Sequence, residues 1–191
     1  MAQLTPPQIA LSRLARVDEQ LFEAVSDLGE ERSSRWVADT APSIKWHLWH
    51  MARWADYVQS LIDPLIEKKR GRSELGPQLW AALGIDDDWG FSGRNLGLWG
   101  VGSTLASEES QDLPFPELRQ IVAYARATFE ALEMRVGVLD ETAFNQPFTD
   151  WHDNETTLGD ALIGYIAHAN RHLGMIEALR GVLGMHGSVT V

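Results

Sequence analysis

Two histidines one helical turn apart are the residues of this sequence best suited to chemistry. His168 and His172 lie in the run from Tyr165 to Gly174, which is typical of a helix. Residues four apart lie on one helix face, so the two imidazoles project together. That face is otherwise apolar and carries Leu158, Ala161, Tyr165, Met175, Leu179 and Val182. Two imidazoles on such a stripe either each find a hydrogen-bond partner or together bind a metal ion.

A third histidine on another helix strengthens the metal interpretation. A catalytic metal site commonly takes three protein ligands and leaves one position open for water or substrate. The second helical pattern supplies His47 and His50, both near its inner side. Facing helices of a bundle build sites of this kind in the core. The residues alone leave open which of the two histidines joins the pair.

Four helical patterns must position these side chains. Apolar residues at spacings of three and four predict helices after Pro6-Pro7, from about residue 44 to 62, from near 114–116, and from about 157 to 183. Thr157 and the Thr40–Ser43 segment are expected helix caps, and Pro64 is expected to end or kink the second helix. Asp18, Glu19 and Glu23 are expected at the surface. The pattern predicts an all-α four-helix bundle that forms one domain over residues 1–191.

A long segment interrupts the helical pattern. Residues 68–113 are punctuated by glycine and predict an ordered crossover loop between the second and third helices. Its aromatic residues indicate packing, with the mouth of a pocket as the alternative. They are Trp80, Trp89, Phe91 and Trp99.

Composition excludes several classes of function. The formal net charge of −11 argues against nucleic-acid binding, and the basic run at 68–70 is better explained as a solvated helix end. No apolar stretch approaches a membrane span, and the first residues lack the features of a signal peptide. We therefore expect a cytoplasmic protein. Because the chain contains no cysteine, any thiol must arrive with a substrate.

The histidine motifs resemble those of the DinB-like superfamily. The resemblance rests on Trp46-His47-Leu48-Trp49-His50-Met51-Ala52-Arg53 together with the run from His168 to Ile176, and helix order and lengths extend it over nearly the whole chain. It implies a metal held by His50, His168 and His172. The resemblance also implies that His47 lies behind the ligands or packs there. Further pocket residues are then Trp46, Trp54, Tyr57 and Tyr165.

The resemblance implies a metal-dependent thiol S-transferase acting on a small molecule, with mycothiol, bacillithiol or glutathione as the thiol. The alternatives are a metal-dependent hydrolase and a non-catalytic bundle that binds metal or senses a ligand. Zinc, nickel and iron all accept imidazole ligands, so the three histidines do not identify the metal. The candidates are divalent zinc, nickel, iron and manganese. The group that performs catalysis is not identified by the residues. A homodimer is expected from the family.

Overall fold

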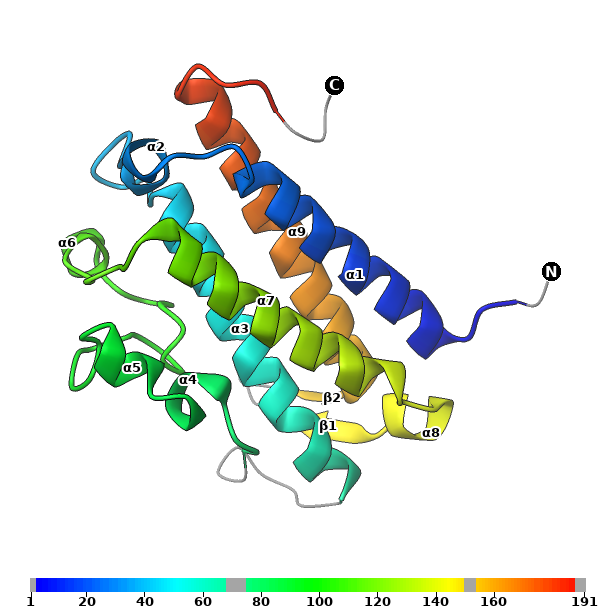
Figure 1. The fold of residues 1–191 in the computed structure, drawn as a ribbon. Coiled ribbons are helices and arrows are strands. Elements are labelled where there is room, and N and C mark those ends of the chain that lie inside the picture. The colour runs from blue at the N-terminus through cyan, green and yellow to red at the C-terminus, as the bar shows by residue number, and fades with distance from the viewer. Residues whose placement is uncertain (1–2, 68–74, 150–153, 188–191) are drawn as a thin grey trace.

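Four long helices form the body of the molecule. The computed structural model describes residues 3–67, 75–149 and 154–187. The long helices are α1 (Pro6–Val25), α3 (Ile44–Ile66), α7 (Leu118–Gly137) and α9 (Leu158–Val182). The predicted all-α four-helix bundle is confirmed, and Figure 1 shows its arrangement.

The helix starts follow local sequence signals. Pro6 occupies the first turn of α1, and Gln8 accepts a hydrogen bond from the backbone N–H of Thr5. Ser43 caps α3 by accepting from the N–H of Trp46, and Thr157 caps α9 by accepting from the N–H of Asp160. These hydroxyls satisfy backbone donors that have no partner inside the helix.

The connections contain short elements. One of them, α4 (Leu79–Ala82), lies where the sequence from Pro77 to Leu83 allows a short helix. The sequence pattern did not predict the others, which are α2 (Glu30–Ser34), α5 (Ile85–Asp88), α6 (Ser107–Gln111), α8 (Glu141–Phe144), β1 (Pro147–Thr149) and β2 (Glu155–Thr157). The two strands pair antiparallel, with Pro147 opposite Thr157. Elements of three to five residues are too short for a periodic pattern, so tertiary contacts decide them.

Each long helix packs against two others. α3 packs against α7 and α9, and α1 packs against the same two helices. Figure 1 shows α3 and α7 running in the same direction, with α4, α5 and α6 in the crossover beside them. Within the described ranges, no helix is long and apolar enough to cross a membrane.

A proline near the end of α3 affects how the crossover leaves that helix. Residues 68–74, which include the predicted basic run, lie outside the described residues. Pro64 lies in the last turn of α3, which continues to Ile66. Proline has no N–H to donate to the carbonyl of Ser60. That carbonyl instead accepts from the N–H of Gly76 at 2.7 Å, which ties the crossover to α3.

Three expectations about individual positions were wrong. The third long helix begins at Leu118, after the proline-containing stretch 114–116, because each proline disfavours helix at the residue before it. Asp18 is buried rather than at the surface. Met175 and Val182 are exposed on α9, where Ile176 lies on the buried face.

Candidate metal centre

Three histidine side chains from two helices converge in the bundle. One ligand nitrogen each from His50, His168 and His172 lies within 4.8 Å of the other two, and no second such group occurs among the described residues. The Nε2 atoms of His50 and His168 are 3.2 Å apart. Two ligand nitrogens bound to a tetrahedral zinc at 2.0–2.1 Å are about 3.3 Å apart, so this separation fits a shared ion.

The orientation of His50 is fixed by the backbone of the crossover. Its Nδ1 hydrogen-bonds to the carbonyl oxygen of Val101. A carbonyl only accepts, so Nδ1 carries the proton and the lone pair lies on Nε2, the atom that faces His168. Hydrogen bonds of this kind orient the histidine ligands of metal sites.

His47 fills the corresponding position behind His172. A hydrogen bond of 2.8 Å joins the Nδ1 atoms of the two rings. When Nδ1 of His172 is the donor in this contact, the lone pair of the ring lies on its Nε2, where an ion would bind. His47 therefore contacts one member of the triad.

Burial keeps the histidines neutral. It lowers the pKa of His47 to about 4, of His50 to about 3 and of His168 to about 4. Burial also lowers the pKa of His172, and the neighbouring imidazoles lower it further. Neutral imidazole is the form that binds metal, so the donor set is ready at neutral pH.

Aromatic rings enclose the triad. Trp46 stacks on His50 with ring centres 4.7 Å apart and planes 14° apart. The ring centre of Trp54 lies 5.3 Å from that of His168 and 5.7 Å from that of Trp99 in the crossover. His168 is the least buried member of the triad. The indole rings of Trp54 and Trp99 thus lie on the side of His168, the most exposed of the three ligands.

The other predicted residues are distributed differently. Tyr57 packs against Trp54 and Trp99 on the same side of the triad. Tyr165 is buried. Burial is the main cause that raises its pKa, and the charges of Asp18 and Glu133 raise it further. His186 is exposed near the chain end. His152 lies outside the described residues.

Sequence reasoning offered Trp99 as part of a possible pocket mouth but missed that the backbone of loop 96–104 contacts the centre. Val101 contributes only its backbone, for which no side-chain pattern exists. The density of glycine between 97 and 102 was the available signal, because Gly97, Gly100 and Gly102 all have positive φ. A Cβ at Gly102 would lie 2.7 Å from the ring of Trp49, so the backbone approaches α3 closely there.

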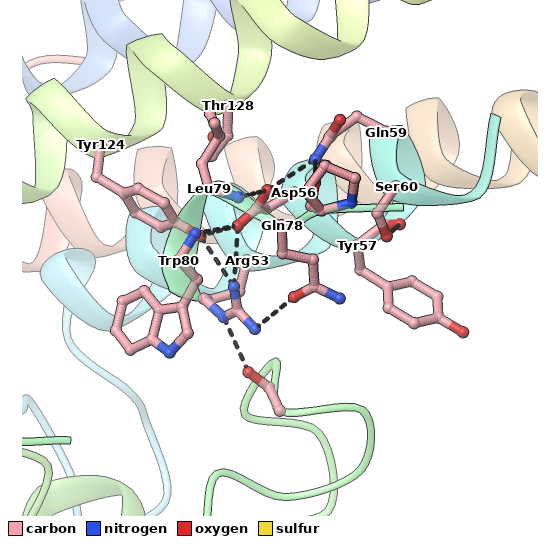
Figure 2. A network of polar contacts seen from close by, with 12 residues as sticks. Arg53, Asp56, Tyr57, Gln59, Ser60, Gln78, Leu79, Trp80, Tyr124 and Thr128 are labelled. Atoms are coloured by element: carbon pink, nitrogen blue, oxygen red, sulfur yellow. Dashed lines mark hydrogen bonds and ion pairs between the residues drawn. The ribbon is translucent and has the colours of Figure 1, made fainter. Parts of the chain in front are cut away.

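A buried polar network behind His50 was also missed. Arg53 and Asp56 form an ion pair on α3 in which both side chains are buried. Figure 2 shows the network around them. Two charged residues within an otherwise apolar stretch of helix were the signal in the sequence.

One known protein family matches most of the chain. A family model described as the DinB superfamily matches residues 13–176. No curated protein matches the chain.

Two solved structures share the fold. A conserved protein from Enterococcus faecalis has a TM-score of 0.76 and 18% identity, over 95% of this chain and 99% of that chain. YfiT from Bacillus subtilis has a TM-score of 0.67 and 15% identity, over 97% of this chain and 93% of that chain. YfiT is described as a probable metal-dependent hydrolase with an unusual four-helix bundle topology.

Proposed function

This chain belongs to the DinB superfamily, and we propose that it is a metal-dependent enzyme acting on a small molecule. The ligands are His50, His168 and His172. The observation that carries the proposal is the convergence of three neutral imidazoles, two of them buried, with the Val101 carbonyl directing Nε2 of His50 toward His168. The three side chains come from α3 and α9, two neighbouring helices that pack directly against each other.

We further infer that the reaction is transfer of a small thiol. A divalent ion held by three neutral ligands keeps its full charge and deprotonates a thiol or lowers the pKa of water. The chain has no cysteine, so the thiol is a separate molecule such as mycothiol, bacillithiol or glutathione. In the reaction the thiol loses its proton, its sulfur bonds to an electrophilic carbon, and a leaving group departs from that carbon.

The surroundings of the triad support this chemistry. His47, Trp46 and Trp54 pack against the three ligands, and no carboxylate of the described residues is among the charges that shift the pKa of the three histidines. A thiol activated by an ion needs no carboxylate base. The indole of Trp54 beside the half-buried His168 offers a flat apolar surface that suits an apolar electrophile.

Hydrolysis of a small substrate is the second candidate. The description of YfiT as a probable metal-dependent hydrolase favours it. The same ion would then act on water rather than on a thiol. A non-catalytic bundle that binds metal or senses a ligand is the remaining alternative.

One experiment separates these functions. The purified protein is analysed for zinc, nickel, iron and manganese, and each metal-loaded form is incubated with an electrophile and each candidate thiol. We expect loss of the thiol at a rate that falls at least about 100-fold in His172→Ala, since loss of one ligand weakens the whole site.

The controls use the same chain. His186→Ala removes an exposed histidine and should leave both metal content and rate unchanged. Cleavage of esters or amides without thiol consumption would establish hydrolysis instead. Metal binding with neither reaction would make the site non-catalytic, and absence of metal uptake would reject the three-histidine ligand set.

A further inference from the structure

The loop from Leu96 to Thr104 supplies two contacts to the metal centre. The carbonyl of Val101 accepts from His50, and Trp99 packs against Trp54 beside His168. The loop closes on itself, because the N–H of Gly102 donates to Leu96 and the N–H of Leu98 donates to Ser103, both at 2.7 Å. Any shift of this closed loop therefore moves both contacts together.

Arg53 connects this loop to α3. Its Nε donates to the carbonyl of Gly100 at 3.0 Å, one residue before Val101. Arg53 lies three residues after His50, so the same helical turn carries the ligand and the group that holds the ligand's partner. The guanidinium thus fixes the loop relative to the histidine that the loop orients.

Both terminal nitrogens of Arg53 also donate hydrogen bonds. One terminal nitrogen donates to Asp56 at 3.1 Å and to the hydroxyl of Tyr124 at 3.0 Å, and the other donates to Gln78 at 3.0 Å (Figure 2). The guanidinium also lies over the ring of Trp80, with 4.7 Å to its centre. A lysine has one nitrogen and cannot reproduce this fork.

Asp56 holds Arg53 and the start of the crossover at once. Its carboxylate is fully buried and accepts from the N–H groups of Leu79 and Trp80 at 2.8 Å each. Tyr124 of α7 donates to it at 2.8 Å. The pair therefore joins α3, α7 and two separate parts of the crossover.

We propose that Arg53 is a positioning residue for the metal centre. With Asp56 behind it, Arg53 holds loop 96–104 so that the Val101 carbonyl presents Nε2 of His50 to the ion. This role rests on the proposed metal site. It adds a residue that does not touch the ion and that the three-histidine motif does not contain.

The test is zinc affinity in Arg53→Lys, measured by calorimetric titration of the metal-free protein. We expect the dissociation constant to rise about 10- to 100-fold, the range seen when the partners behind metal ligands are removed. The visible spectrum of the Co²⁺-loaded variant should also differ from that of the unaltered protein, because the geometry at His50 changes.

Arg180→Lys is the matched control. Arg180 is equally buried and paired with Asp27, but it lies near the end of α9, more than two turns from His172. We expect a lower melting temperature in this variant, with zinc affinity and Co²⁺ spectrum unchanged. A role in stability alone would predict that both variants lose zinc affinity in step with their melting temperatures.

Gln78→Leu provides a second variant if Arg53→Lys does not fold. It removes one acceptor from the guanidinium at a half-buried position and leaves the ion pair with Asp56 intact. We expect weaker zinc binding at a nearly unchanged melting temperature. Unchanged zinc affinity in the folded variants, with normal binding by the unaltered protein, would overturn the inference alone. Absence of zinc binding by the unaltered protein would instead reject the proposed function and this inference with it.

Discussion

Burial is the main cause of the raised pKa of the Asp18 carboxyl group. Its side chain is 2% exposed, on the side of α1 that faces α7 and α9. Burial, with the nearby Glu133 second, raises its pKa from 3.8 to about 8. The folded protein therefore holds this proton more tightly than the unfolded chain. Its contribution to stability falls as pH rises from about 4 to about 8.

Replacement of Asp18 should remove this pH dependence. Asn keeps the shape and cannot ionise, so we expect Asp18→Asn to raise the melting temperature relative to the unaltered protein at pH 8, with little difference at pH 4. Thermal unfolding at both pH values measures this. Asp27→Asn is a control of opposite sign, because the hydrogen bond from Arg180 lowers the pKa of Asp27. An equal effect of Asp18→Asn at both pH values would contradict the assignment.

At this scale the sequence identified the histidine pair but not all of its surroundings. The spacing of His168 and His172 follows directly from helix geometry. The residues did not separate His47 from His50, because both lie on the inner side of α3, and only the backbone of Val101 distinguishes them. Asp18 was placed at the surface because nothing in a single sequence indicates a second carboxyl group facing it from α7.

At the scale of elements, loop 96–104 can be tested through its glycines. Gly102 has φ of +89°, and an added Cβ would meet Trp49 at 2.7 Å and Trp46 at 3.2 Å. Gly93 has φ of +75° with open space around it. We expect Gly93→Ala to cost about 1–2 kcal/mol of unfolding free energy through backbone strain alone. Gly102→Ala should cost more, because the loop must also move.

Denaturant unfolding and zinc titration of both variants check this prediction. Zinc binding should weaken only in Gly102→Ala, since the displaced backbone carries the Val101 carbonyl. The prediction fails if the two variants bind zinc equally well or lose the same stability.

Long helices were predictable because their apolar periodicity extends over five or more turns. The strands β1 and β2 were not, since three residues carry no period. Pro64 was expected to end or kink the helix. In the structure it leaves the carbonyl of Ser60 without a helical donor, and the N–H of Gly76 donates to that carbonyl instead. That outcome depends on a segment 12 positions further along the chain, which local patterns do not include.

At the scale of the whole molecule, a bound ion should join two helices that are distant in sequence. His50 lies on α3, and the other two ligands lie on α9. An ion that binds only the folded protein, present at about 100 times its dissociation constant, stabilises it by about 2.7 kcal/mol. For a chain of this size we expect the melting temperature to rise by about 5–10 °C.

Calorimetric scans with and without a chelator measure this shift. His172→Ala is the control, because a protein with two of the three ligands should show a much smaller rise. An equal rise in both proteins would place the stabilising ion elsewhere. The bundle itself was predictable from four helical patterns and one long crossover, while the homodimer and the cytoplasmic location stay predictions.

The burial of α3 has a consequence for how such a protein can diverge. Every residue from Ile44 to Ile62 is buried, so the central part of this helix has no face on which substitutions are neutral. Much of the crossover between 81 and 109 is exposed or half-buried. Lineages descended from this sequence can therefore drift most freely at the exposed positions of this segment outside loop 96–104, while the helix that carries His50 and Arg53 stays nearly fixed. Such a division would let the proposed enzyme acquire a new substrate preference without first losing its histidine cluster.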